Sequence, residues 1–170
     1  AGAGGAEARV LLEQRARING GTQPAVPLEP VIPGDEIERA ALGYLHANCG
    51  VSCHNPTPHA AAADSGLFLR LELSKLDSVM STEAYRTAIN RSPNFAAQIF
   101  VGAGSPSGVY YDVRPLDPER SLILVRMKTR GLLQQMPRIG TNQVDATGVG
   151  IVGDWIARMT RERGYPPPLP

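Results

Sequence analysis

The segment Tyr44–Pro56 reads Tyr-Leu-His-Ala-Asn-Cys-Gly-Val-Ser-Cys-His-Asn-Pro and contains both cysteines of the chain. Cys49 and Cys53 are four positions apart, and His54 follows the second of them directly. Residues four apart share a face of a helical turn, so both thiols can face one neighbour. Gly50 gives the backbone the freedom that a slightly distorted turn needs. The segment predicts one site built from two thiols and an imidazole.

These residue types point to a covalent haem. In the attachment sequence C-x-x-C-H two thiols add across the vinyl groups of the porphyrin and the histidine binds the iron; here three residues separate the cysteines. A disulfide loop and half of a zinc site are the alternatives. Zinc normally takes four ligands, and the other histidines are His46 and His59, both close by. We expect haem, because a disulfide would give no reason for a histidine directly after the second cysteine.

A haem iron held by one imidazole takes a second axial ligand, and thioether sulfur is the common partner in cytochromes c. The methionines of the chain are Met80, Met127, Met136 and Met159. Met127 and Met159 fall on predicted helices, whereas Pro137 and Gly140 predict a loop around Met136. A loop side chain can point at the iron, so Met136 is the expected distal ligand. A surface-loop role for Met136, or ligation by His59, remains the alternative.

Three stretches together resemble a mono-haem, class I-type bacterial cytochrome c domain. The first stretch, residues 40–56, is the cysteine motif with the helix before it. The second, residues 117–127, begins Asp-Pro-Glu-Arg-Ser, and the third, residues 136–156, runs from Met-Pro to Trp-Ile. The resemblance covers roughly residues 36–160. It implies a mainly α fold whose helices wrap a covalent haem c, with thioethers at Cys49 and Cys53, His54 as proximal ligand and Met136 as distal ligand.

The chain divides into three expected parts. Residues 1–34 are predicted to form an N-terminal helix, at 6–18, and a proline-rich extended arm. Residues 35–163 correspond to the cytochrome c-like haem domain, and residues 164–170 form a proline-rich tail. The chain contains 18 glycines and 15 prolines, which predict long loops within the domain.

Inside the domain we expect a helix over 35–49 to cross a last helix over 146–163, with Ala41 and Gly43 small enough for a close approach. The connecting region contains two strand-like segments and two further predicted helices. The segments are 67–73 and 95–101 for the strands, and 81–90 and 121–131 for the helices, the last one ended by Gly131. The strand-like segments allow a small β-hairpin insertion.

The sequence also suggests which groups support the haem. A carbonyl of Pro56 or Pro58 is expected to accept the Nδ1–H of His54 and so fix its tautomer. Guanidinium groups pair well with carboxylates such as haem propionates. The candidates for that contact are Arg126, Arg130 and Arg138.

The expected function is electron transfer by a single haem c. With both axial positions filled by the protein no site is open to substrate, so an electron carrier with redox partner proteins is expected rather than an enzyme. The alternatives are a haem domain or subunit of a larger redox enzyme or of a multihaem or membrane electron-transfer complex, and a haem-free, disulfide-stapled binding module.

Charge and hydropathy limit the other classes. A net charge of +1 argues against a nucleic-acid-binding face. The chain has no run of about twenty apolar residues that would predict a membrane span. Because haem c is attached outside the cytoplasm, we expect a periplasmic or other extracytoplasmic protein, and a mature chain without its signal peptide.

Overall fold

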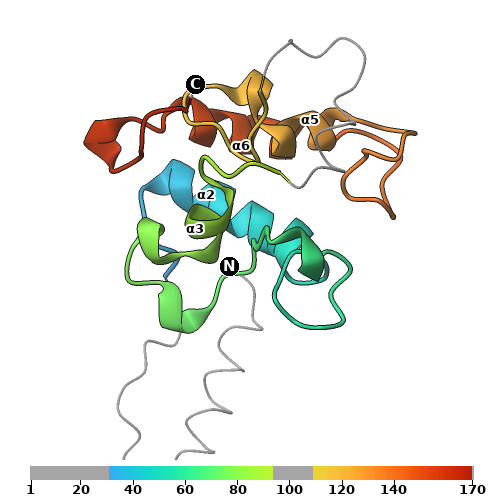
Figure 1. Cartoon of the computed structure of the whole chain (residues 1–170), viewed down its shortest axis with the longest axis horizontal. Coiled ribbons are helices and arrows are strands. Elements are labelled where there is room, and N and C mark those ends of the chain that lie inside the picture. Colours follow the sequence, from blue (N-terminus) through green and yellow to red (C-terminus); the bar gives the residue numbers. More distant parts are fainter. Residues whose placement is uncertain (1–30, 94–108, 170) are drawn as a thin grey trace, which may run out of the picture. The chain divides into compact units, whose positions relative to one another are not determined.

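The computed structural model describes residues 31–93 and 109–169, which belong to one compact unit (Figure 1). The predicted helix 6–18 and strand 95–101 lie outside these residues. In the described part the regular elements are all helical, which confirms a mainly α class. The α-helices are α2 (Glu36–Leu45), α3 (Glu83–Ala88), α5 (Leu122–Lys128) and α6 (Ala146–Ala157). A π-helical turn (His46–Gly50) continues α2, and short 3₁₀ turns lie at Ala63–Ser65, Leu73–Lys75, Val79–Ser81, Pro118–Arg120 and Arg161–Arg163.

Helix α2 begins with a reciprocal capping box. The Asp35 side chain accepts the Glu38 N–H at 2.9 Å, and the Glu38 carboxylate accepts the Asp35 N–H at 2.8 Å. Two of the orphan donors of the first turn are thereby satisfied, and the acidic groups lie at the positive end of the helix. The inner face of α2 buries Ala41, Leu42 and Leu45. The predicted helix 35–49 is therefore present, with its last turn in π-helical form.

Helix α2 packs against α6, as expected (Figure 1). The small residue at the contact is Gly148, where an added Cβ would overlap the ring of Tyr44. The Tyr44 hydroxyl donates to Asp145 at 2.9 Å, and Asp145 in turn caps α6 by accepting the Gly148 N–H. The prediction that Gly43 serves this crossing is wrong, because its added Cβ would face Ile32 instead.

Three predicted helices are shorter in the structure. The helix expected over 146–163 ends at Ala157, and Arg158 already leaves helical geometry with φ −105° and ψ 8°. The helix expected over 121–131 ends at Lys128, because Thr129 is extended. The helix expected over 81–90 is α3, capped by the Thr82 side chain. The buried side chains of these helices form one core with α2, and include Ala88, Ile123, Leu124, Met127, Val152, Trp155 and Ile156.

Residues 67–73 are not a strand, which corrects the prediction from their alternating pattern. Their N–H groups have partners other than a neighbouring strand: Ser65 Oγ for Leu67, Thr87 Oγ1 for Phe68, the His54 carbonyl for Leu69 and His46 Nδ1 for Leu71. The described residues contain only isolated bridges, Ile89 with Val113 and Tyr111 with Ser121. The alternating apolar and polar pattern of residues 67–73 therefore did not give the segment a neighbouring strand to pair with.

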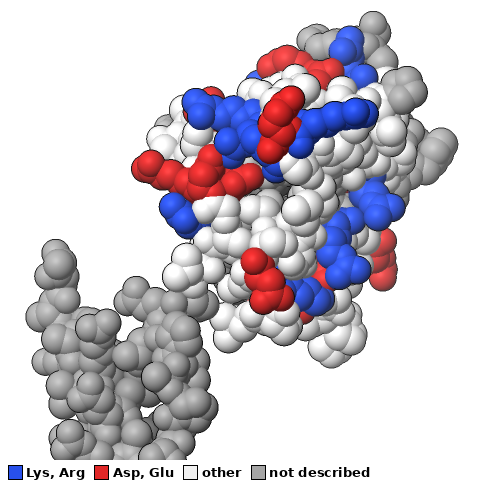
Figure 2. All heavy atoms as spheres, turned by 90° about the vertical axis from the view of Figure 1, so that its left-hand side faces the viewer, with Lys and Arg blue, Asp and Glu red and all other residues white. Residues whose placement is uncertain are grey.

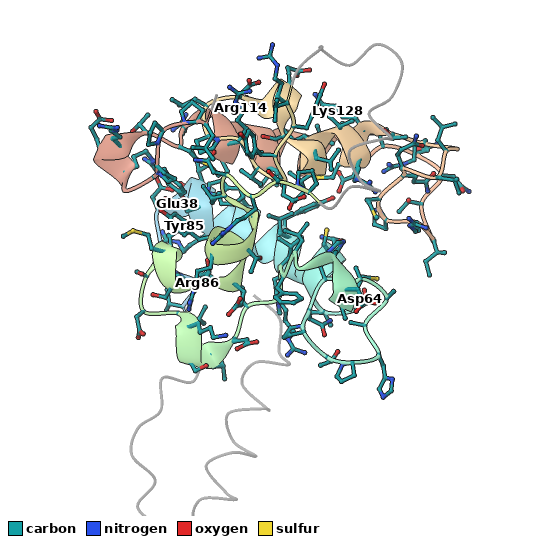
Figure 3. The ribbon with its side chains drawn as sticks, viewed as in Figure 1. Glu38, Asp64, Tyr85, Arg86, Arg114 and Lys128 are labelled. Atoms are coloured by element: carbon teal, nitrogen blue, oxygen red, sulfur yellow. The ribbon has the colours of Figure 1, made fainter. Side chains whose placement is uncertain are left out.

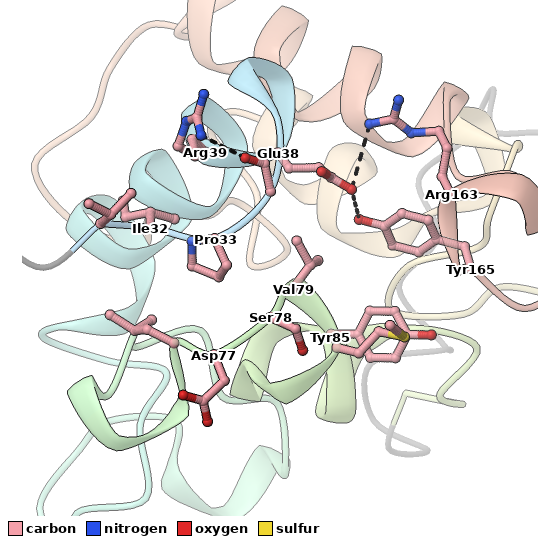
Figure 4. Close-up of a pocket in the computed structure, with 14 residues that line it drawn as sticks. Ile32, Pro33, Glu38, Arg39, Asp77, Ser78, Val79, Tyr85, Arg163 and Tyr165 are labelled. Carbon is pink, nitrogen blue, oxygen red and sulfur yellow. Dashed lines mark hydrogen bonds and ion pairs between the residues drawn. The ribbon is translucent and has the colours of Figure 1, made fainter.

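The C-terminal segment returns to the start of α2 (Figure 4). Trp155 Nε1 donates to the Tyr165 hydroxyl at 2.9 Å, and that hydroxyl donates to Glu38 at 2.9 Å. Arg163 pairs with Asp35 and lies 3.6 Å from the Glu38 carboxylate. On the face shown in Figure 2 acidic and basic side chains lie side by side. No helix in the described part of the chain has the length and apolar character that crossing a membrane requires.

Candidate functional site

A cavity of about 580 Å³ brings together the cysteine motif, the end of α5 and the loop around Met136. Its volume lies in the range of roughly 300–1,000 Å³ that is typical of ligand and cofactor sites. Its apolar wall includes Leu67, Leu69, Leu122, Ile123, Met127 and Leu133. Its polar groups are those of Cys49, His54, Asp64, Ser65, Asp112, Arg126 and Arg138. Segments far apart in sequence thus converge on one largely apolar space.

The extra residue between the cysteines is taken up by a π-helical conformation. Val51 N–H donates to the His46 carbonyl at 3.0 Å, and His54 N–H donates to the Cys49 carbonyl at 2.8 Å. Both bonds span five residues, where an α-helix spans four. The added residue therefore widens the turn while His54 remains bonded to the backbone of Cys49.

Gly50 serves a close approach. A Cβ at this position would lie 2.5 Å from the backbone of Leu69 and Arg70, so no larger residue fits. The buried Asn55 then closes the turn by donating from Nδ2 to the Gly50 carbonyl at 2.9 Å and to the Val51 carbonyl at 3.1 Å. These contacts hold the motif rigidly at the cavity wall.

His54 presents one defined nitrogen to the cavity. Its Nδ1 lies 3.2 Å from the carbonyl oxygen of Leu67, which can only accept, so Nδ1 carries the proton and Nε2 keeps its lone pair. Burial lowers the pKa of His54, and the nearby Arg126 charge lowers it further. The side chain is thus a neutral imidazole, the form that binds metal. The predicted acceptors, Pro56 and Pro58, are replaced by Leu67.

The two cysteines differ in position. Both are free thiols, but Cys49 lines the cavity whereas Cys53 does not. Burial raises the pKa of Cys49 to about 11, with a smaller contribution from Cys53. Cys53 Sγ lies beside the Ser52 hydroxyl at 3.5 Å. Only the first of the two predicted attachment points therefore faces the cavity.

Met136 lies in a loop at the cavity wall, as predicted. Its N–H donates to the Arg126 carbonyl at 3.1 Å, and Gln135 ties the loop by donating to Pro137 and Thr141 carbonyls at 3.2 and 2.9 Å. Arg130 braces the same loop by donating to the Met136 carbonyl at 3.4 Å. The loop is therefore held by main-chain contacts that leave the Met136 side chain on the cavity.

The other candidate ligands are placed differently. Met127 is 5% exposed and belongs to the core, but it also lines the cavity from α5. Met159 is buried in the core away from this cavity, and Met80 lines a separate one. His59 is exposed, and His46 accepts the Leu71 N–H at 3.0 Å. Met127 is thus the nearest structural rival to Met136.

Two arginines bring positive charge to the cavity. Neither Arg126 nor Arg138 forms a hydrogen bond or ion pair through its guanidinium group with any described residue, although both line the cavity. Burial lowers the pKa of Arg126, and the charge of Arg138 lowers it further. Two unpaired guanidinium groups facing one space favour an anionic group there. Arg130, the third candidate, is used in bracing the Met136 loop.

A second cavity, of about 520 Å³, lies between the start of α2, the 76–80 segment and the C-terminal segment (Figure 4). The buried carboxylate of Glu38 in its wall accepts hydrogen bonds from the Asp35 N–H and the Tyr165 hydroxyl and forms an ion pair with Arg163. None of the predicted ligand or attachment residues lines it. The Glu38 carboxylate is thus satisfied within the chain and makes no demand for a ligand.

Comparison with protein-family models, curated proteins and solved structures finds no match to the chain. Within the described ranges no three His, Cys, Asp or Glu side chains converge as metal ligands. The sequence pattern identified Cys49, His54, Met136, Arg126 and Arg138, which line the cavity, but missed the Leu67 carbonyl and Asp112. No local signal marks either, because each reaches the cavity through long-range folding.

Proposed function

We propose that the chain binds one covalent haem c in the cavity between the cysteine motif and the Met136 loop, and that it transfers single electrons. The observation that supports this most is the convergence of a neutral His54 and a loop-borne Met136 on the same cavity as Cys49. Imidazole and thioether are the axial pair of cytochromes c. The proposed domain is therefore cytochrome c-like, with helices around the haem.

The residues present fit this group. The cavity volume and the leucine-rich wall suit a large planar apolar ligand, and the unpaired Arg126 and Arg138 suit its propionate carboxylates. Cys49 is placed for a thioether bond, whereas Cys53 must turn toward the cavity for a second one. The cavity thus matches the cofactor in size, polarity and attachment chemistry.

The chain's own residues would control the redox reaction. Haem supplies a one-electron iron couple when bound. His54 Nε2 and Met136 Sδ would hold the iron and would so exclude water and substrate from it, while the Leu67 carbonyl orients the imidazole and raises its basicity. A thioether ligand would favour the reduced state and raise the reduction potential. The apolar wall limits the solvent reorganisation that accompanies each electron.

The second candidate is a haem domain or subunit of a larger redox enzyme or electron-transfer complex. The observation that favours it is the presence of Met127 beside Met136 in one cavity, because a site with two available sulfurs can release one ligand. Fast binding of carbon monoxide to the ferrous protein would favour this alternative. In both cases we propose redox proteins as partners and an extracytoplasmic location, where haem c is attached.

Replacement of His54 by alanine tests the proposal. The chain is produced together with a cytochrome c maturation system, and the absorption spectrum of the folded protein is recorded for wild-type, His54→Ala, His46→Ala and His59→Ala. The proposal predicts that His54→Ala loses the low-spin spectrum while the other two variants keep it. Loss of that spectrum in His59→Ala as well as in His54→Ala would replace Met136 by a histidine and predict a much lower potential.

A further inference from the structure

Asp112 is an acidic side chain in the wall of the same cavity. Its backbone is fixed on both sides, since its N–H donates to the Arg91 carbonyl at 2.8 Å and its carbonyl accepts the Ile123 N–H at 3.1 Å. Its chain neighbours form the bridges Tyr111–Ser121 and Ile89–Val113. Among the described residues the carboxylate has no hydrogen-bond or ion-pair partner. The fold therefore holds an unpaired carboxylate at the cavity.

The other charged and titratable groups that face this cavity come from several segments. The charged ones are Arg126 on α5, Arg138 after the Met136 loop and Asp64 in the loop after the cysteine motif (Figure 3). The titratable but neutral ones are the His54 imidazole and the Cys49 thiol. Burial raises the pKa of Asp112 to about 7, although the Arg126 charge opposes this shift. An apolar ligand in the cavity removes more water and strengthens the same effect.

We propose that Asp112 takes up a proton when the haem in this cavity is reduced, so that electron transfer is coupled to proton transfer; this inference rests on the proposed function. Reduction removes one positive charge from a poorly screened space, which makes a nearby carboxylate less stable in its ionised form. One electron arrives from the redox partner and one proton arrives from solvent and binds a carboxylate oxygen of Asp112. The total charge of the cavity is then unchanged.

The reduction potential of the haem-loaded protein, measured from about pH 5 to about pH 9, tests this coupling. In the wild-type protein the reduction potential should fall as pH rises near neutrality, with a slope that approaches about 59 mV per pH unit for a one-electron couple. At a fixed potential this is a tenfold change per pH unit in the ratio of reduced to oxidised protein. Asp112→Asn should remove this slope, and Asp112→Glu should retain it. Asp64→Asn, which removes an exposed carboxylate from the same cavity, should keep the wild-type slope.

Infrared difference spectra between the oxidised and reduced wild-type protein give a second test that needs no variant. Reduction near neutral pH should produce the carbonyl band of a protonated carboxylic acid, and isotope-labelled aspartate should shift that band. A potential independent of pH, an unchanged slope in Asp112→Asn, or a band insensitive to the label would overturn the inference while leaving haem binding intact. A preparation without covalent haem would overturn the proposed function and this inference with it.

Discussion

At the scale of single residues, one hydrogen bond decides which atom of His54 is available. The Leu67 carbonyl fixes the proton on Nδ1 and so leaves the lone pair on Nε2, and burial keeps the ring neutral. The acceptor lies 13 residues away in sequence and is positioned by the extended segment that was expected to be a strand. The ligand was therefore predictable from its motif, while its orienting partner was not.

Met136 and Met127 can be separated by substitution. Met136→Ala should erase the long-wavelength sulfur-to-iron band of the ferric protein, lower its potential and allow cyanide or carbon monoxide to bind. Met127→Ala should leave that band in place and lower the free energy of unfolding by about 2–5 kcal/mol, as a core truncation does. Absorption spectra and denaturant unfolding measure both effects. The opposite pattern would make Met127 the distal ligand.

Asp112 should make stability depend on pH. Its pKa in the folded protein, about 7, lies above the value of roughly 3.9 expected for an unfolded chain, so the folded state binds more protons between these limits. The free energy of unfolding should therefore fall as pH rises from about 4 to about 7, by about 4 kcal/mol at most. Asp112→Asn should lack this component in denaturant titrations at several pH values. An equal slope in both proteins would contradict the burial of an unpaired carboxylate.

At the scale of elements, sequence reasoning succeeded where the signal is local. The helix predicted to begin at residue 35 is α2, and the loop around Met136 follows from Pro137 and Gly140. The strand predicted over 67–73 failed because alternation does not supply a pairing partner, and its N–H groups bind side chains and the His54 carbonyl instead. The π-helical turn was not predicted either, because residue spacing alone does not show which hydrogen bond absorbs an added residue.

The contact of α2 with α6 depends on a missing side chain at Gly148. Gly148→Ala should lower the free energy of unfolding by about 1–3 kcal/mol, because the added Cβ overlaps the Tyr44 ring. Gly150→Ala in the same helix meets no atom within 4 Å and should raise it by about 0.5–1 kcal/mol through helix propensity. Thermal or denaturant unfolding compares the two. Similar effects at both positions would show that the helices do not cross at Gly148.

At the scale of the whole molecule, the cavity is where distant parts of the chain meet. The cysteine motif, the segment with Asp112, helix α5 and the Met136 loop all contribute to its wall. No single local pattern encodes this meeting. The sequence predicted that Met136 would reach the cysteine motif from far along the chain, but not that the segment with Asp112 would form part of the same wall. A ligand in this cavity would complete the core and join these segments.

Covalent haem is the central claim, and one sample tests it most directly. The chain, produced with a cytochrome c maturation system, is denatured, its mass is measured and its spectrum is recorded in alkaline pyridine. The proposal predicts the mass of the chain plus one haem. The spectrum should be that of haem c with two thioethers if Cys53 turns inward, or shifted toward a vinyl-bearing haem if Cys49 alone reacts. A denatured chain with the mass of the free polypeptide would contradict the account.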